Sequence, residues 1–489
     1  MLLKDLLEHI SYTCLQGDIT KEVSELIYDS RKVVPGCVFV CISGAVFDAH
    51  TFVAEAAEKG AAAIITEKEV ELPEGAAVIR VEDTRLALAH MSAAYFRYPA
   101  EKLITIGVTG TKGKTTTAYM MKSILENTGK KVGLIGTIET IIGDRVIPAS
   151  NTTPESYLIQ QTFAEMAEAG CELVVMEVSS QGLKLNRVAG FTYDYGVFTN
   201  LGEDHIGGAE HTDFQDYLTS KSKLFKQCKV GLVNIDDEHA EEILTGHTCK
   251  VETFGFSQDA DIRATDIKLI QRSGYLGIAY RINGLMNLAV EMNIPGKFNV
   301  YNSLCAISLC RHFGVSNEEI LKALKHVNVR GRVELVPVSE KFSVMLDYAH
   351  NAMSLQSLLT TLKEYQPKRL VCLFGCGGNR SRSRRFEMGE VSSNLADLTV
   401  VTSDNPRFEE PQDIVNDIIE GVRRGPGEYV EILDRKEAVR YVIEHAREGD
   451  VVVIAGKGHE DYQEIKGVKY PMDDRLLIRD AAAEADILK

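Results

Sequence analysis

Short apolar runs alternate with longer amphipathic stretches along most of the chain. Runs such as Leu370 to Phe374 and Val451 to Ala455 are continuous and end in glycine or polar residues. Such runs are typical of strands that are buried on both faces of a sheet. Stretches with apolar residues on one side, such as Phe214 to Lys226, predict helices. Repeated strand–helix alternation predicts an α/β fold with doubly wound, mostly parallel sheets.

Further elements follow from the same patterns. Strands are also expected at Cys37 to Ile42, Ala61 to Thr66, Lys131 to Ile135, Glu172 to Val178, Asp194 to Asn200, Val230 to Ile235, Phe342 to Leu346 and Leu398 to Thr402. Helices are expected at Thr51 to Lys59, at Ala118 to Asn127, and from the NTTPE segment to Gly170, the last with a threonine cap. Residues 250–295 alternate like β-structure.

The length of the chain predicts about three domains. The chain has 489 residues, and about 150 residues is a typical domain size. Tyr98-Pro99-Ala100 has the composition of a linker. We expect a small α/β domain over residues 1–99, a central domain over 100–330 and a Rossmann-like α/β domain over 331–489.

A glycine-rich loop follows the apolar run that begins at Ile104. It reads TGTKGKTTT and is followed by a helical pattern. Glycines let backbone N–H groups approach phosphates, the helix N-terminus favours negative charge, and Lys114 adds a positive charge. The hydroxyl of Thr115 is placed to hold Mg²⁺. The spacing departs from the general P-loop pattern, whose first glycine would fall at Val108. A glycine-rich turn without a nucleotide is the alternative.

Three residues after the loop are candidates for metal chemistry. Glu177 ends a buried strand, where ligands bind in α/β folds; a solvated strand end is the alternative. His205 follows Asp204 and is a candidate metal ligand or a structural histidine. Lys221 lies on an expected helix, where a solvated face is the ordinary interpretation.

Polar or glycine-rich segments follow four strands of the last domain. They are DYAHN from Asp347, GCGGNR from Gly375, DNPR from Asp404 and GKGHE from Gly456. The carboxyl ends of parallel strands meet at one edge, so these segments predict a ligand cleft there.

Composition and charge argue against several classes of protein. The formal net charge is −16, which argues against nucleic-acid binding, because phosphate neutralisation needs a basic face. Ten cysteines are scattered without metal-site spacing, so we expect reduced thiols and a cytoplasmic protein. We expect no membrane span, because no apolar run reaches the ~18–20 residues that a bilayer requires.

An ordered set of motifs resembles the Mur ligase family over nearly the whole chain. In order, the motifs are TGTKGKTT, NTTPE, MEVSSQGL, TNLGEDH, GKFNVYN, GRVE, DYAHN, GCGGNR, DNPR and GKGHE. The resemblance implies a central P-loop-type domain and an ADP-forming ligase of peptidoglycan precursor synthesis. ATP would phosphorylate a UDP-N-acetylmuramoyl-L-alanyl-D-glutamate carboxylate, and the amine of an amino acid would then attack the acyl phosphate. We expect the partners to be small-molecule substrates, the cofactor to be Mg²⁺ and the protein to be a monomer.

The resemblance assigns roles residue by residue. Catalytic roles fall on Lys114, Glu177, His205 and Lys221, with Lys221 carbamylated and Mg²⁺ near Thr115, Glu177, His205 and Lys221. ATP would contact Gly110, Thr111, Lys112, Gly113, Lys114, Thr115, Thr116, Asn302, Arg332, Asp347, His350 and Asn351. The UDP-muramoyl dipeptide would contact Ser30, Asn151, Thr152, Thr153, Ser179 and Arg187. Asp29-Ser30-Arg31 is equally compatible with a simple turn and helix cap.

The amino-acid site falls in the last domain. Its residues would be Arg380, Asp404, Asn405, Pro406, Arg407, Gly456 and Glu460. Family members that use meso-diaminopimelate carry DNPR. Asn405 and Arg407 can pair with the distal carboxylate and amine of that zwitterion, with Arg407 bidentate on the carboxylate. Lysine-adding members usually differ there. Taken alone, DNPR is also compatible with a simple Asn-Pro turn.

Several positions depart from the family pattern. They are Gln181, where histidine is common, Leu185, the segment after His205, and Ala352 after DYAHN. These departures leave a paralogue with another acceptor as an alternative, beside a lysine-adding ligase, a folylpolyglutamate synthetase and a non-catalytic nucleotide-binding regulator.

Overall fold

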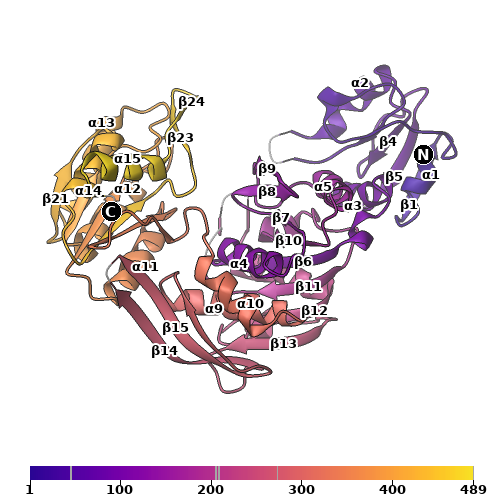
Figure 1. Ribbon diagram of the computed structural model, residues 1–489. Coiled ribbons are helices and arrows are strands. Elements are labelled where there is room, and N and C mark those ends of the chain that lie inside the picture. The colour runs from indigo at the N-terminus through magenta and orange to yellow at the C-terminus, as the bar shows by residue number, and fades with distance from the viewer. Residues whose placement is uncertain (45–46, 204–205, 208–209, 273, 488–489) are drawn as a thin grey trace. The chain divides into compact units, whose positions relative to one another are not determined.

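The structure is a computed structural model that describes residues 1–44, 47–203, 206–207, 210–272 and 274–487. Its contacts divide the chain into two compact units. Unit 1 comprises Met1–Asp261 and Cys305–Gly314, and unit 2 comprises Ile262–Leu304 and Val315–Lys489. Each unit is an α/β structure, so the predicted fold class is confirmed (Figure 1).

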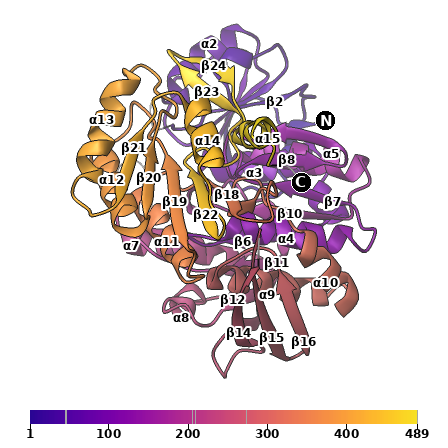
Figure 2. The same cartoon turned by 60° about the vertical axis from the view of Figure 1, so that its left-hand side comes forward.

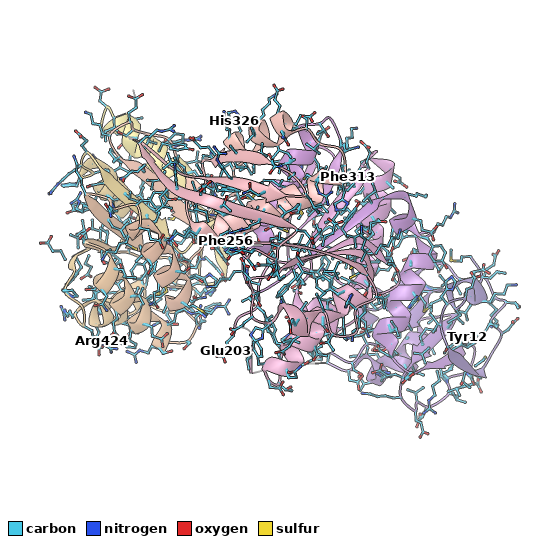
Figure 3. All side chains as sticks on the ribbon, turned by 90° about the horizontal axis from the view of Figure 1, so that it is seen from below. Tyr12, Glu203, Phe256, Phe313, His326 and Arg424 are labelled. Atoms are coloured by element: carbon cyan, nitrogen blue, oxygen red, sulfur yellow. The ribbon has the colours of Figure 1, made fainter. Side chains whose placement is uncertain are left out.

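The N-terminal part of unit 1 is a five-stranded sheet in the order β1-β5-β4-β3-β2. Only the edge strand β1 is antiparallel to its neighbour, and Tyr12 lies on this strand (Figure 3). Val38, Ile65 and Ile79 pack with Leu88 of α3. The elements are α1 Leu3–Leu6, β1 Tyr12–Gln16, β2 Leu26–Ile27, η1 Ser30–Lys32, β3 Val38–Val40, η2 Ala49–Phe52, α2 Val53–Glu58, β4 Ala63–Thr66, β5 Ala77–Val81, α3 Thr84–Tyr95 and η3 Pro99–Lys102.

The remainder of unit 1 contains a larger sheet. Its strands follow the order β13-β12-β11-β6-β10-β7-β8-β9; the first six are parallel, and β8 and β9 form an antiparallel extension. The elements are β6 Ile104–Thr109, α4 Lys114–Glu126, β7 Val132–Ile135, β8 Glu139–Ile142, β9 Arg145–Pro148, α5 Ser156–Glu168, β10 Leu173–Glu177, α6 Ser180–Lys184, β11 Tyr193–Phe198, α7 Phe214–Ser222, η4 Lys223–Lys226, β12 Cys228–Asn234, α8 Ala240–Ile243 and β13 Lys250–Gly255.

The strand order of this sheet places a crevice at the end of β6. The chain runs from β6 to β7 on one side, returns to β10 beside β6, and then continues to β11 on the other side. Ligands of open α/β sheets bind at such a reversal, outside the carboxyl ends of the strands. The glycine-rich loop follows β6 directly and therefore occupies this position.

Unit 2 contains an antiparallel sheet and a second mostly parallel sheet. Strands β14, β15 and β16 are antiparallel neighbours, and the other sheet has the order β17-β18-β22-β19-β20-β21. The elements are β14 Ile262–Arg272, β15 Tyr275–Gly284, β16 Leu288–Met292, α9 Lys297–Arg311, α10 Asn317–His326, β17 Glu334–Leu335, β18 Ser343–Asp347, α11 Ala352–Lys363, β19 Arg369–Phe374, α12 Ser383–Leu395, β20 Leu398–Val401, α13 Pro411–Val422, β21 Glu428–Glu431, α14 Arg435–Glu444, β22 Asp450–Ala455, β23 Tyr462–Ile465, β24 Val468–Pro471 and α15 Asp474–Glu484. Helix α9 begins in unit 2 and ends in unit 1.

Helices cover both faces of the parallel sheet in unit 2. Helices α12 and α13 lie on one side, and α14 and α15 lie on the other (Figure 2). Val439 of α14 and Ile478 of α15 pack against Val344 and Ile454 of the central strands. Burial on both faces explains why these strands are continuous apolar runs in the sequence.

Two details differ from the expectations. The expected helix over 214–226 breaks into α7 and the 3₁₀ helix η4. The expected threonine cap of α5 is wrong: Glu155 precedes its first residue, and no side chain caps the helix. The hydroxyl of Thr153 instead donates to the carbonyl oxygen of Glu177 at 3.0 Å.

The ten cysteines are free thiols, and nine of them are buried. This agrees with the expected reduced state. Among the described residues, no helix is long and apolar enough to cross a membrane.

Candidate functional site

The segment that follows β11 fixes the conformation of the loop after β6. Gly110 has a φ of +150°, and a Cβ there would lie 1.9 Å from Thr199 Oγ1, so only glycine fits. The backbone N–H of Thr111 donates to the Asn200 carbonyl at 2.8 Å, and that of Lys112 donates to Asn200 Oδ1 at 2.9 Å. The TNLG motif thereby shapes the phosphate loop, a role that the sequence did not assign to Asn200.

Two lysines meet at the carbonyl group of Gly110. Lys114 Nζ donates to Gly110 O at 2.8 Å and to Thr111 O at 3.1 Å. Lys221 Nζ donates to Gly110 O at 2.9 Å and is 1% exposed, so a solvated face is the wrong interpretation of Lys221. Gly113, with a φ of +86°, precedes the first residue of α4. Two ammonium groups and a helix N-terminus at one loop form an anion-binding site.

A buried carboxylate lies beside this loop. Glu177 at the end of β10 is 0% exposed, and its Oε2 accepts from Thr115 Oγ1 at 2.8 Å. The backbone N–H and the hydroxyl of Thr137 also donate to this carboxylate, both at 2.9 Å. Glu177 is therefore not a solvated strand end. Sequence reasoning missed Thr137, although it follows the neighbouring strand β7 at the same sheet edge, which is the signal that would have found it.

The oxygen atoms around Glu177 suit a hard divalent cation. Mg²⁺ takes oxygen ligands and usually keeps several waters, so one carboxylate and one hydroxyl are a normal protein contribution. Thr115 and Glu177 provide this pair. Asp204 and His205 lie outside the described residues, within which no three His, Cys, Asp or Glu side chains gather as a metal cluster.

The residues predicted to bind the dipeptide gather at the same sheet edge. Thr152 Oγ1 lies 3.1 Å from Thr137 Oγ1, and the N–H of Ser179 donates to Thr153 Oγ1 at 2.9 Å. Arg187 Nη1 donates to the Thr153 carbonyl at 3.1 Å. Asn151 is exposed beside them. The structure thus brings these predicted residues together.

Glu155 links this group to helix α3 of the N-terminal part of unit 1. Its carboxylate lies 2.8 Å from Arg187 Nε and 3.3 Å from Arg85 Nη1, so it orients both guanidinium groups. The NTTPE motif contains Glu155, but the sequence did not assign it a role. Ser30 lies in η1, where Asp29 accepts from the N–H of Arg31. Within the described ranges, Ser30 has no hydrogen bond to the residues around Glu177.

The predicted nucleotide residues of unit 2 surround Tyr348. The Arg332 guanidinium lies 5.0 Å from the Tyr348 ring centroid. The Asp347 carboxylate accepts from the N–H groups of Val333 and Ala349, both at 2.8 Å. Burial raises the pKa of Asp347, while the charge of Arg332 opposes that shift.

His350, Asn351 and Asn302 have structural partners in the same unit. His350 Nδ1 donates to the Tyr348 carbonyl at 2.8 Å; burial lowers the pKa of His350. Asn351 caps α11 through the N–H of Ser354 at 2.9 Å. Asn302 is buried in α9 and donates to a side chain of the preceding turn at 2.9 Å.

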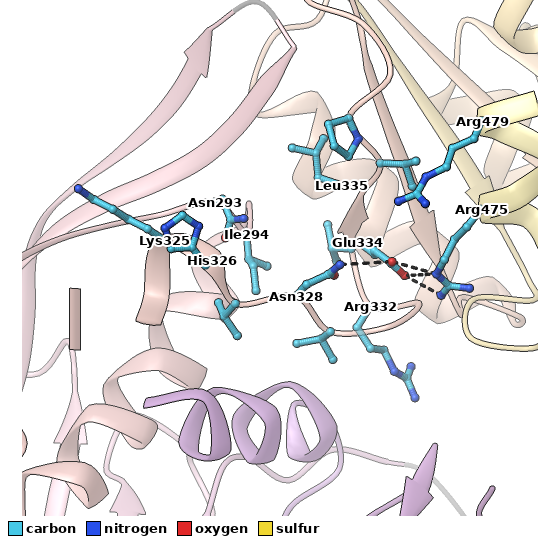
Figure 4. Close-up of a pocket in the computed structure, with 15 residues that line it drawn as sticks. Asn293, Ile294, Lys325, His326, Asn328, Arg332, Glu334, Leu335, Arg475 and Arg479 are labelled. Atoms are coloured by element: carbon cyan, nitrogen blue, oxygen red, sulfur yellow. Dashed lines mark hydrogen bonds and ion pairs between the residues drawn. The ribbon is translucent and has the colours of Figure 1, made fainter. Parts of the chain in front are cut away.

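Arg332, Glu334 and Arg475 are among the residues that line a pocket in unit 2 (Figure 4). Glu334 accepts from Arg475 at 2.6 Å and from Asn328 at 3.4 Å, whereas Arg332 extends away from that pair (Figure 4). Arg332 Nε is buried and has no hydrogen-bond partner among the described residues. A buried donor without a partner beside an aromatic ring is a place where a ligand acceptor fits.

The DNPR loop is buried against the GKGHE segment. Asn405 is 3% exposed, its Nδ2 donates to Glu460 Oε2 at 2.8 Å, and its Oδ1 accepts from Lys457 Nζ at 3.1 Å. Burial raises the pKa of Glu460, and the charge of Lys457 opposes that shift. Gly456 has a φ of +105°, and a Cβ there would lie 3.0 Å from Asp404 Oδ2. The sequence did not single out Lys457, although it is part of the quoted motif.

Arg407 lies at the open side of this loop. Its Nη1 donates to the Gly378 carbonyl at 2.7 Å, and its Nε donates to Glu464 at 3.2 Å. Pro406 is buried, and Arg380 is exposed. The structure brings four predicted residues of this segment together. Asn405 bonds to both Asp404 and Glu460, and Gly456 lies beside Asp404.

Three family models match successive parts of the chain. They are the Mur ligase family catalytic domain over residues 22–96, the Mur ligase middle domain over 108–310 and the Mur ligase glutamate ligase domain over 331–458. The exact boundaries at 99 and 330 stay predictions.

Curated relatives match over almost the whole chain. A UDP-N-acetylmuramoyl-L-alanyl-D-glutamate--2,6-diaminopimelate ligase of Clostridium perfringens is 40% identical, with 98% of this chain and 99% of the relative covered. A ligase of that name from Clostridium acetobutylicum is 41% identical, with 99% and 100% covered.

Solved structures agree with these relatives. A structure of a UDP-N-acetylmuramoyl-L-alanyl-D-glutamate--2,6-diaminopimelate ligase has a TM-score of 0.74 and 29% identity, covering 99% of both chains. MurF from Acinetobacter baumannii, at 20% identity, a TM-score of 0.61 and coverage of 99% and 98%, shares the fold.

Proposed function

Because the chain belongs to the Mur ligase family, we propose that it joins meso-diaminopimelate to UDP-N-acetylmuramoyl-L-alanyl-D-glutamate at the expense of ATP. The reaction would form ADP, phosphate and one amide bond. The observation that carries this proposal is Glu177, a fully buried carboxylate, beside a loop that has two lysines on one carbonyl. A reaction that uses ATP and a UDP-linked precursor would take place in the cytoplasm, where both nucleotides are available.

In the first step, a carboxylate oxygen of the UDP-linked glutamate attacks the γ-phosphorus of ATP. The bond to the bridging oxygen breaks, and ADP leaves. Lys114, the N-terminus of α4 and the loop N–H groups stabilise the negative charge on the phosphate oxygens.

Thr115 and Glu177 would hold Mg²⁺, which neutralises phosphate charge when it is bound. Thr137 orients the Glu177 carboxylate with two hydrogen bonds, so that an oxygen faces the loop. A carbamate on Lys221 would replace a positive charge at Gly110 with a negative one.

In the second step, the neutral amine of the amino acid attacks the acyl-phosphate carbonyl. The C–N bond forms, the C–O bond to phosphate breaks so that phosphate leaves, and the nitrogen passes its extra proton to solvent. Arg187, held by Glu155 and by the Thr153 carbonyl, is placed to bind a carboxylate of the acceptor. In the C-terminal site, Arg407 would bind the distal carboxylate of diaminopimelate.

The amino-acid preference tests this proposal directly. ATP- and UDP-muramoyl-dipeptide-dependent phosphate release would be followed with meso-diaminopimelate, L-lysine, L-ornithine and no amino acid. We expect a strong preference for diaminopimelate, a preference that Arg407→Lys removes because a lysine cannot form the bidentate pair. Lys114→Met should stop release with every amino acid.

Two other outcomes would redirect the proposal. Preference for lysine would keep the ligase chemistry and overturn the diaminopimelate assignment. Binding of ATP without turnover with any amino acid would favour a nucleotide-binding regulator or a paralogue with another acceptor. The match of residues 22–96 to a family domain already argues against an N-terminally shortened folate-type ligase.

A further inference from the structure

A second carboxylate lies beside Arg407, outside every motif. Glu464 is on β23, and its Oε2 accepts from Arg407 Nε at 3.2 Å. The side chains of Arg407 and Glu464 are 22% and 23% exposed, so both are partly shielded and both remain reachable from solvent. Opposite charges therefore lie side by side at the open edge of the DNPR loop.

The hairpin of β23 and β24 fixes this pair through its backbone. The N–H of Arg407 donates to the Glu464 carbonyl at 3.0 Å, and the N–H of Lys466 donates to the Arg407 carbonyl at 2.7 Å. The N–H of Glu464 donates to Asn405 Oδ1 at 2.9 Å. Arg407 has a left-handed φ of +53°, which this double attachment holds. The two side chains are thus presented from one rigid strand contact.

Glu460 and Glu464 differ in the partners that they have. Glu460 is engaged by the Asn405 amide at 2.8 Å and lies 3.6 Å from Lys457 Nζ. The only side-chain partner of Glu464 among the described residues is Arg407, through one oxygen. Glu464 therefore keeps acceptor capacity for a ligand donor, as does the Arg407 guanidinium for a ligand carboxylate.

The pair matches a zwitterion in which the ammonium and carboxylate share one carbon. We propose that Glu464 is a specificity-determining residue that binds the distal ammonium of the amino-acid substrate while Arg407 binds its distal carboxylate. The proposal rests on the diaminopimelate ligase activity proposed above. A substrate with a distal carboxylate alone would use Arg407 and leave Glu464 unpaired.

A comparison of two substrates can show whether Glu464 binds the distal ammonium or only orients Arg407. meso-2,6-Diaminopimelate and L-2-aminopimelate have the same chain and both carboxylates, but the second has no distal amine. In Glu464→Gln, an amide oxygen still accepts from Arg407 Nε, and only the negative charge is lost. We expect kcat/KM for diaminopimelate to fall about tenfold, mainly through KM, a factor that corresponds to ~1.4 kcal/mol. The value for aminopimelate should stay the same or rise.

Matched controls make the outcomes separable. Glu428→Gln changes an exposed carboxylate on β21 and should leave both substrates unaffected. Equal losses for both substrates in Glu464→Gln would mean that Glu464 only orients Arg407, and no change in either would also overturn the proposal. A failure of the proposed ligase activity would give a different result from a failure of the Glu464 proposal. In that case the unmodified protein itself would release no phosphate with diaminopimelate.

Discussion

At the scale of single residues, several charged side chains are almost completely buried. Glu177, Lys221, Lys457 and Arg435 are each at most 1% exposed. Burial of an unpaired charge is costly, so each of these groups has polar partners. Arg435 donates to Asp474 at 2.7 and 2.8 Å and is structural. Glu177 ends β10 and Lys457 follows β22, at the carboxyl ends of strands, where ligands bind. Lys221 lies on α7 and reaches the loop after β6 with its ammonium group.

His459 predicts a pH dependence of stability. Burial, aided by the charges of Arg332, Arg330 and Arg475, lowers its pKa from 6.5 to about 4. As the pH falls through 6.5, the unfolded chain takes up a proton that the folded chain takes up only near 4. The stability that His459 contributes is therefore complete above 6.5 and is lost as the pH falls towards 4.

Denaturant midpoints at pH 7.5 and 5 would measure this effect. We expect His459→Gln to lose less stability between these two pH values than the unmodified protein does. His445→Gln is the control, because His445 is exposed and follows α14. This variant should keep the difference in stability between the two pH values that the unmodified protein has. An unchanged difference in His459→Gln would show that other groups cause the acid sensitivity.

At the scale of elements, the short helix α6 depends on side chains of α7 and of the segment before it. Helix α6 has five residues, too few to be stable alone. His211 is 1% exposed, and its Nε2 lies 2.9 Å from Ser180 Oγ. Lys184 Nζ donates to Asp216 at 2.6 Å. These contacts hold the helix whose capping residue, Ser179, is a candidate substrate contact.

Loss of the His211 contact should affect one substrate more than the other. We expect His211→Gln to raise KM for the UDP-muramoyl dipeptide about tenfold, ~1.4 kcal/mol, because the N-terminus of α6 is no longer fixed. KM for ATP should change little, since the Gly110 loop is held by Asn200. Initial rates with each substrate varied in turn would measure this.

His247→Gln provides the matched control, because His247 is exposed after α8. It should leave both KM values unchanged. Equal increases of both KM values in His211→Gln would indicate general damage to unit 1, and no increase would show that α6 does not depend on this contact.

At the scale of the whole molecule, the compact units differ from the family domains. The middle-domain model covers residues 108–310, but Ile262–Leu304 cluster with the C-terminal residues in unit 2. Tyr365, after α11, provides one reason. Its hydroxyl accepts from the N–H of Gly296 at 3.0 Å and donates to the Gly277 carbonyl at 2.9 Å.

Tyr365→Phe should destabilise unit 2 while its shape is preserved. The change leaves a buried backbone donor and acceptor without their partner, which costs about 1–3 kcal/mol. Denaturant unfolding, followed by hydrogen exchange of β15 and α11, would measure the loss. Tyr470→Phe removes an exposed hydroxyl on β24 and should cost almost nothing; an equal midpoint for both variants would contradict this role of Tyr365.

The sequence by itself determined the fold class, most strand positions and the phosphate loop. Apolar runs and the loop's glycines and lysine are local features, and strands buried on both faces must be apolar throughout. The family motifs then assigned most of the residues that gather around Glu177 and Asn405.

Only the tertiary structure decided what the partners of these residues are. Lys221 and Gly110 are 111 positions apart in sequence, and Thr137 and Glu177 are 40 apart. Thr153 of NTTPE bonds to the end of β10 instead of capping α5, Thr152 contacts Thr137 after β7, and Glu464 lies outside the motifs. Such contacts depend on which strand ends are neighbours in the sheet, and that is a property of strand order, which no local pattern encodes.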